Sequence, residues 1–301
     1  MTWRPAGLVP VLATPFDETG ALDLASLRRL VQFEVDNGVD AVATFGMASE
    51  GFALTVADRT AILATIRQVG GDSLPVIAGV SATSTVTAVE QAKQAADGGA
   101  DMLMVLPPYM VKPTAGQLVE FYGQVGAVGV PVQVQDAPAT TGVAMPPDLI
   151  AKLSRIEGVT SVKIEAPPTT TKVAAVRAVV AEDFAIFGGL NAQFAIDEFL
   201  RGAVGTMPAC EFPDLLRPVL DDLRAGHGTD ARKRFTRLLP LILFGLQPGI
   251  AWAVHKHVLV HRGIIDSAAV RAPAQQADFQ TVSSLRDVLD QLGIVRADAD
   301  D

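Results

Sequence analysis

The strongest constraint on the fold is an alternation of short apolar runs with longer amphipathic segments along most of the chain. The runs are rich in Val, Ile and Leu, as buried parallel strands are, and the segments between them repeat their apolar residues with helical period. Eight runs occur, beginning near Leu8, Asp40, Pro75, Asp101, Pro131, Val159, Phe184 and Ala203. Eight such units of roughly 20–35 residues predict an α/β fold, a (β/α)8 TIM barrel, although a doubly wound open sheet shares most of these signals.

Several of the amphipathic segments have recognisable ends. Asp23 opens a segment that stops at Asn37-Gly38, and Thr55 with Asp58 has the spacing of a capping box. After the eighth run, further helical patterns follow at 215–223, 230–244, 249–261 and 279–292. We therefore expect a barrel catalytic domain over residues 1–213 and a C-terminal helical extension over 214–301 that packs on it.

Charge and cysteine content exclude several classes of protein. Asp and Glu number 33 against 24 Lys and Arg, a net charge of −9, which would repel nucleic-acid phosphates and anionic lipid. The single cysteine, Cys210, can form neither an intramolecular disulfide nor a Cys-rich zinc site. Pro10, Pro15 and Asp17 interrupt the N-terminal apolar stretch, which is too short for a signal peptide or a membrane span. We expect a cytoplasmic protein that binds neither nucleic acid nor membrane.

The active site of such a barrel lies at the C-terminal ends of its strands, and Lys163 stands out there. Strand alternation in the sixth run places Val162 and Ile164 towards the helices, and Ser161, Lys163 and Glu165 towards the barrel interior. An ammonium is costly to desolvate there, and a neutral amine can attack a carbonyl carbon to form an imine. The alternative is a structural lysine that pairs with Glu165 or Asp136, or that extends to the rim.

The other loops at this end of the barrel are less specific. Gly46 and its neighbours could form a nest of backbone N–H groups for a carboxylate, or a tight turn. Gly188-Gly189 could hold a phosphate, as barrels often do after strands seven and eight, but no basic residue follows closely. His255, His257 and His261 lack the glutamate of an H-E-x-x-H motif, so helix packing is the better interpretation than zinc binding.

Six segments in a fixed order resemble a known family. They are VPVLATPFDETGALD at 9–23, FGMASEGFALTVADR at 45–59, PVIAGVSATST at 75–85, GADMLMVLPPYMVKP at 99–113, QDAPATTG at 135–142 and GVTSVKIEA at 158–166. Over residues 7–213 the chain resembles the dihydrodipicolinate synthase/N-acetylneuraminate lyase family. The resemblance implies a (β/α)8 barrel with a helical tail, usually a homotetramer. It also implies catalysis without metal or organic cofactor, through an imine between Lys163 and pyruvate or another 2-oxo acid.

The departures from the family pattern concern proton transfer. The usual Gly-Thr-Thr-Gly-Glu loop is Gly46-Met47-Ala48-Ser49-Glu50, so both threonine hydroxyls are missing, although the N–H groups of Met47 and Ala48 could still bind a carboxylate. Gln135 stands at the position of the strand-five tyrosine, Thr140 at that of an arginine, and Met110 at that of a second tyrosine. Glutamine cannot transfer protons as a phenol can, which argues against dihydrodipicolinate synthase activity. Acid–base help would come from Asp136, Ser49, Glu50, Tyr109 or an ordered water.

We therefore predict a Schiff-base-forming (class I) lyase, an aldolase or a dehydratase of a 2-oxo-3-deoxy sugar acid, and a homodimer or homotetramer. The alternatives are a non-catalytic 2-oxo acid sensor, a true 4-hydroxy-tetrahydrodipicolinate synthase with an atypical proton relay, and a phosphate-dependent enzyme that uses Gly188-Gly189. The predicted catalytic residues are Lys163, Gln135 and Tyr109. The predicted substrate-binding residues are Gly46, Met47, Ala48, Ser49, Asp136, Thr140, Gly189 and Met207.

Overall fold

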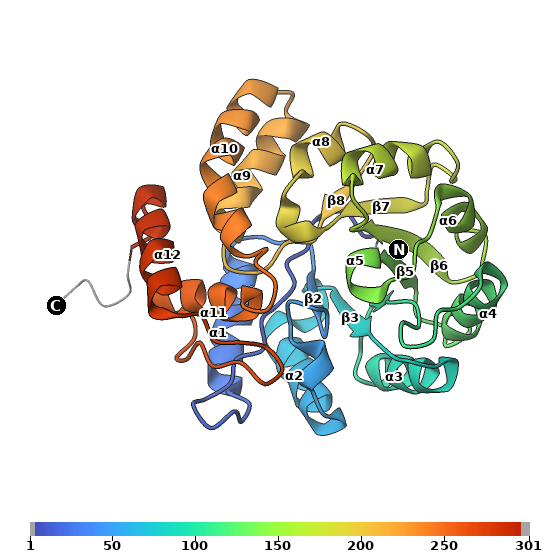
Figure 1. Ribbon diagram of the computed structural model, residues 1–301, viewed down its shortest axis with the longest axis horizontal. Coiled ribbons are helices and arrows are strands. Elements are labelled where there is room, and N and C mark those ends of the chain that lie inside the picture. Colours follow the sequence, from blue (N-terminus) through green and yellow to red (C-terminus); the bar gives the residue numbers. More distant parts are fainter. Residues whose placement is uncertain (1–3, 296–301) are drawn as a thin grey trace.

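The computed structural model describes residues 4–295 and contains an eight-stranded parallel barrel (Figure 1). The strands are β1 Gly7–Leu8, β2 Val42–Thr44, β3 Val76–Val80, β4 Met102–Val105, β5 Val132–Asp136, β6 Val159–Ile164, β7 Ala185–Gly188 and β8 Gly205–Thr206. Each strand pairs with its neighbour in the order β1-β8-β7-β6-β5-β4-β3-β2. Val11 closes the ring, because it bridges Ala43 of β2 and Ala209 beyond β8. The barrel is confirmed, and the open sheet is ruled out.

Helices follow the strands and surround the barrel. They are α1 Leu24–Asp36, α2 Val56–Gly70, α3 Thr85–Asp97, α4 Ala115–Gly126, α5 Pro138–Thr141, α6 Pro147–Leu153, α7 Thr169–Arg177, α8 Ala195–Phe199 and α9 Pro213–Arg224. The predicted caps are confirmed: Asp23 accepts a hydrogen bond from the backbone of Ser26, and Thr55 and Asp58 form the capping box.

The barrel has two apolar layers, one inside it and one between its strands and the surrounding helices. The interior is filled by Val9, Val11, Ala41, Ala43, Ile77, Met102, Met104, Phe187 and Met207. Val162 and Ile164 belong instead to the larger cluster between strands and helices. Strand alternation at the end of β6 is therefore as predicted, with Ser161 and Lys163 facing inward.

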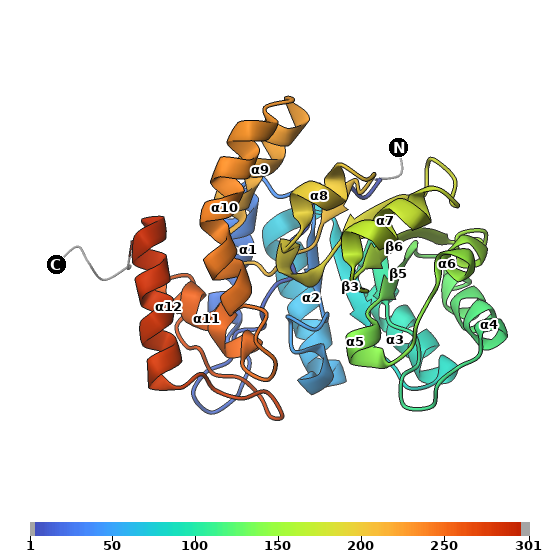
Figure 2. The same cartoon turned by 45° about the horizontal axis from the view of Figure 1, so that its top comes forward.

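The last helices are α10 Gly228–Phe244, α11 Ala251–His261 and α12 Phe279–Leu292, which lie together on one side of the barrel (Figures 1 and 2). Helix α9 packs both on β1 and on α10, so the division at residue 213 stays a prediction. Within residues 4–295, no helix has the length and apolar character needed to cross a bilayer.

Candidate active site

Lys163 lies near the C-terminal end of β6, with Gln135 of β5 and Phe187 of β7 as its register partners. Its side chain is inside the barrel, and the residue is only 4% exposed. The Nζ atom lies 3.2 Å from Oε1 of Glu165. The contact with Glu165 was one of the predicted alternatives, and it does not remove the amine from the site, because Lys163 also lines a cavity.

Glu165 connects the lysine to the neighbouring strand. Its second carboxylate oxygen, Oε2, accepts a hydrogen bond of 2.7 Å from Nε2 of Gln135, while the backbone N of Leu190 lies 3.4 Å from Oε1. Gly189 is required here, because a Cβ at this position would lie 2.3 Å from Cγ of Glu165. Lys163, Glu165 and Gln135 thus form one buried chain of polar contacts.

A cavity of about 250 Å³ opens above Lys163 and Glu165. Four other predicted site residues line it, namely Met47, Ala48, Thr140 and Met207. Asn191, Gln247, Trp252 and His255 also line it, although the sequence analysis did not include them in the site. Gln247, Trp252 and His255 come from the C-terminal extension, so no strand-end rule could have found them.

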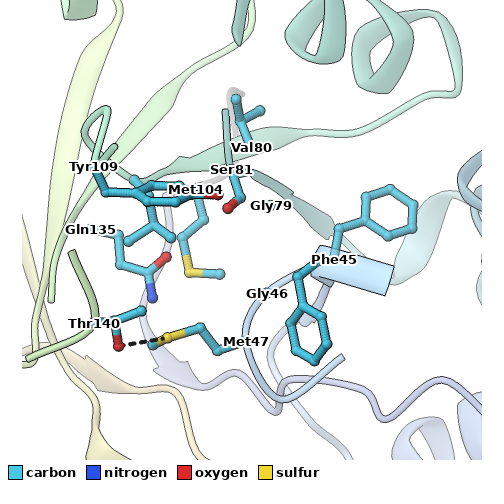
Figure 3. Close-up of a pocket in the computed structure, with 12 residues that line it drawn as sticks. Phe45, Gly46, Met47, Gly79, Val80, Ser81, Met104, Tyr109, Gln135 and Thr140 are labelled. Atoms are coloured by element: carbon cyan, nitrogen blue, oxygen red, sulfur yellow. Dashed lines mark hydrogen bonds between the residues drawn. The ribbon is translucent and has the colours of Figure 1, made fainter. Parts of the chain in front are cut away.

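A second cavity, of about 160 Å³, lies beside the first and is lined by three more predicted residues, Gly46, Tyr109 and Gln135 (Figure 3). Met47 and Thr140 line both cavities. The Thr140 hydroxyl donates a 3.2 Å hydrogen bond to the sulfur of Met47. This contact stands between the two cavities.

The loop after β2 offers backbone donors to the larger cavity. The N–H groups of Ser49, Glu50 and Gly51 bond back to Gly46 and Met47 within the loop. Among residues 4–295, no acceptor binds the N–H groups of Met47 and Ala48, and both residues line the cavity. Free N–H groups next to one another suit a carboxylate.

Helix α11 braces this loop from outside. Glu50 is fully buried and forms an ion pair with Lys256, and its Oε2 accepts a 2.8 Å hydrogen bond from the backbone of Arg271. The indole of Trp252 donates to the carbonyl of Met47 at 2.5 Å. Glu50 therefore has a structural partner and does not line the cavity.

Three predicted site residues line neither cavity. Ser49 is buried under the loop, where its carbonyl accepts a hydrogen bond from Thr14. Asp136 lies on the opposite face of β5 from Gln135 and pairs with Lys172 of α7 at 2.5 Å. Burial raises the pKa of Asp136, and the nearby Lys172 partly offsets the rise. The third, Gly189, gives space to Glu165 as described above.

The glycine pair after β7 is bordered by two carboxylates. A Cβ at Gly188 would overlap Oε2 of Glu198, just as one at Gly189 would overlap Glu165. Burial raises the pKa of Glu198 to about 7, with smaller contributions from Glu165 and Asp197. Because the surroundings are acidic, nothing at this position favours a phosphate.

The three histidines have different environments. His257 and His261 lie between α11 and α12, and His255 pairs with Glu211 at 2.7 Å. In the described part of the chain, no group of three or more His, Cys, Asp or Glu side chains is placed to hold a metal ion.

The fold and this site together define a class: a parallel (β/α)8 barrel with a buried amine beside a carboxylate and two adjacent backbone donors. Comparison with known proteins supports this class. The model of the Dihydrodipicolinate synthetase family matches residues 4–292, and the chain belongs to that family. It is therefore a class I lyase, an enzyme that forms a Schiff base with a 2-oxo acid.

Individual relatives span the whole chain. An L-2-keto-3-deoxyarabonate dehydratase of Azospirillum brasilense is 35% identical over 94% of this chain and 93% of its own length. A 4-hydroxy-tetrahydrodipicolinate synthase of Methylococcus capsulatus is 29% identical over 96% and 99%. The crystal structure of a dihydrodipicolinate synthase from Rhodopseudomonas palustris superposes with a TM-score of 0.89 at 29% identity, covering 95% of this chain and 97% of the other.

Proposed function

We propose that this enzyme dehydrates a 2-oxo-3-deoxy sugar acid through an imine at Lys163, with Glu165 as the acid–base group. The buried chain Lys163–Glu165–Gln135 carries the proposal. It places a carboxylate within 3.2 Å of the amine, in the barrel where the family's tyrosine would otherwise transfer protons. Gln135 donates to Glu165, which holds the carboxylate in one orientation.

The reaction is redox-neutral and balances as the loss of one water. The ammonium of Lys163 releases a proton to solvent, and the neutral Nζ attacks C2 of the substrate. The carbonyl oxygen takes up one proton from solvent and one from Nζ and leaves as water, giving an iminium. Glu165 takes a proton from C3, and the electron pair forms an enamine. The C4 hydroxyl then leaves as water with the proton that Glu165 returns. Water finally hydrolyses the C2–N bond and frees the lysine.

The remaining predicted residues fit binding roles. The N–H groups of Met47 and Ala48 would hold the C1 carboxylate, next to C2 at Lys163. Met207 and Thr140 would border the carbon chain, with Gly46 and Tyr109 behind the Met47–Thr140 contact. Asp136 and Ser49 would act through the shape of β5 and of the loop, without touching the substrate.

The relative from Azospirillum brasilense supports dehydration, since its name specifies a five-carbon 2-oxo-3-deoxy acid. Aldol cleavage through the same imine remains the related alternative. Synthase activity is favoured by several relatives of about 30% identity, but Thr140 gives an aldehyde substrate's carboxylate no positive charge. We further propose a homodimer or homotetramer located in the cytoplasm.

Borohydride trapping tests the proposal. Incubation with pyruvate or a 2-oxo-3-deoxy pentonic acid should leave the reduced ligand covalently on Lys163, as peptide mass spectrometry would detect. Lys163→Ala should lose both adduct and turnover, whereas Lys152→Ala, an exposed lysine on α6, should keep both.

Glu165→Gln separates imine formation from proton transfer. This variant should still form the pyruvate adduct, but its turnover should fall at least about a hundredfold. No adduct with any of a panel of 2-oxo acids would overturn the role of Lys163. An adduct without any product would support the non-catalytic sensor instead.

A further inference from the structure

His255 of α11 faces the catalytic cavity but has no part in the reaction described above. Its Nδ1 lies 2.7 Å from Oε1 of Glu211, and both side chains are buried. No residue in the described range 4–295 hydrogen-bonds to the other ring nitrogen, Nε2. Gly245 makes room for the ring, because a Cβ there would lie 2.4 Å from Cε1 of His255.

The charges around the cavity favour an uncharged ligand tail. Among the described residues that line it, the ionisable side chains are Lys163, Glu165 and His255. Lys163 is next to Glu165, and His255 is next to Glu211. Each basic group is thus accompanied by a carboxylate, and no arginine or further lysine of the described residues lines the wall. A second carboxylate on the substrate would find no unpaired positive charge.

Asn191 and Gln247, two other polar side chains of this wall, each have at least one partner. The Asn191 amide donates to the carbonyl of Ile242 and accepts from the backbone of Ala209. The Gln247 amide donates to the carbonyl of Phe244. The Nε2 atom of His255 is therefore a polar group of this wall that is open to a ligand.

Glu211 determines what a neutral His255 can bind. A carboxylate only accepts hydrogen bonds, so it fixes the proton on Nδ1 and leaves Nε2 as an acceptor. An acceptor binds a hydroxyl, which can donate its hydrogen. It repels a carboxylate, which has no hydrogen to donate.

From this geometry we infer that the His255–Glu211 pair recognises a hydroxyl group on the part of the substrate farthest from C2, by accepting a hydrogen bond from it at Nε2. The pair selects 2-oxo-3-deoxy acids with a neutral, hydroxylated tail over diacids of the same length. The inference rests on the proposed function, because it assumes that C2 of the substrate is held at Lys163.

Three ligands test the inference at pH 8: a 2-oxo-3-deoxy pentonic acid, the diacid 4-hydroxy-2-oxoglutaric acid, and pyruvate, which has no tail. Concentration-dependent borohydride trapping gives an apparent affinity for each. The unmodified enzyme should prefer the hydroxylated acid to the diacid by at least about tenfold, which is the value of one good hydrogen bond.

His255→Phe removes the acceptor and should abolish this preference, and trapping of pyruvate, which has no tail, checks that the variant still folds and forms the imine. His257→Phe is the matched control, since it is on the same helix but lines the α11–α12 side; it should behave like the unmodified enzyme. Glu211→Leu is of similar size but can neither accept from Nδ1 nor donate to it. It leaves the position of the His255 proton unfixed and should weaken the preference for the hydroxylated acid.

The possible failures are distinct. If the unmodified enzyme forms no adduct with any of the three ligands, the proposed function is wrong. If adducts form but His255→Phe keeps the preference, the inference is overturned. Should His255→Phe fail to trap pyruvate because it does not fold, Glu211→Leu decides: an unchanged preference in that variant overturns the inference.

Discussion

The fold moves the pKa of the Glu198 carboxyl close to neutrality. It lies buried on α8, where Thr169 donates a 2.5 Å hydrogen bond to Oε1, and no residue within 4–295 hydrogen-bonds to Oε2. Its pKa rises from 4.5 to about 7, mainly through burial. The folded state therefore holds a proton that the unfolded state releases, and stability should fall as pH rises from 4.5 to 7.

Glu198→Gln should remove this pH dependence. The amide can still accept from Thr169, so the variant should match the unmodified protein near pH 4.5 and exceed it by roughly 3 kcal/mol above pH 7. Urea unfolding at pH 5 and pH 8 measures the difference. An equal difference at both values would show that the carboxyl titrates normally.

For single residues, the sequence predicted the direction of a side chain better than it predicted which side chains contact each other. Alternation within one strand was enough to direct Lys163 inward. The hydrogen bond from Gln135 to Glu165 depends on the register between β5 and β6, which no local pattern encodes. His255 looked like a packing residue because its partner Glu211 and the barrel residues of the cavity are distant in sequence.

Helix α11 is the element that holds the proposed carboxylate loop in place. Lys256 forms an ion pair with Glu50, donates to the carbonyl of Ala269 at 2.6 Å, and lies over the ring of Phe16. Trp252 contacts the same loop twice, at the carbonyl of Met47 and edge-on at Phe52. The loop thus depends on a helix about 200 residues further along the chain.

Breaking the buried pair should be costly. Glu50→Gln leaves the Lys256 charge without its partner and should destabilise the protein by about 3–5 kcal/mol. The double variant Glu50→Gln with Lys256→Met removes both charges and should lose less. Chemical denaturation of the three proteins measures this, and a double variant less stable than Glu50→Gln would contradict it.

The ends of helices could be predicted from the sequence where the capping residues lie close together in the chain. The caps at Asp23 and Thr55 need only residues three positions away, and both are confirmed. The first and last strands are only two residues long, shorter than their apolar runs. Pro10 and Pro208 follow them closely, and proline has no N–H to extend a ladder.

For the whole molecule, the sequence could count strands but could not decide whether the sheet closes. Closure depends on Val11, whose backbone reaches Ala43 on one side and Ala209 on the other. An open sheet of the same strands would have the same apolar pattern, so the choice required long-range contacts. The family resemblance, in contrast, implied the correct architecture, a closed (β/α)8 barrel with C-terminal helices.

The assembly state is a prediction for the molecule as a whole. Next to Tyr109, Met110 is 75% exposed and Val111 is 77% exposed. Light scattering should give a native mass of two or four times 31.6 kDa, and Val111→Asp should weaken association if this loop lies in an interface. A single-chain mass at micromolar concentration would contradict the proposed oligomer.

The closure of the barrel at Val11 also has a consequence for the order in which the chain is synthesised. The ribosome must pass residue 209 before the first strand has both of its neighbours, and residue 256 before the β2 loop has its brace. The reactive amine at position 163 is synthesised well before either. A nascent chain therefore carries the lysine long before it carries the enclosed, correctly charged chamber in which that lysine can act.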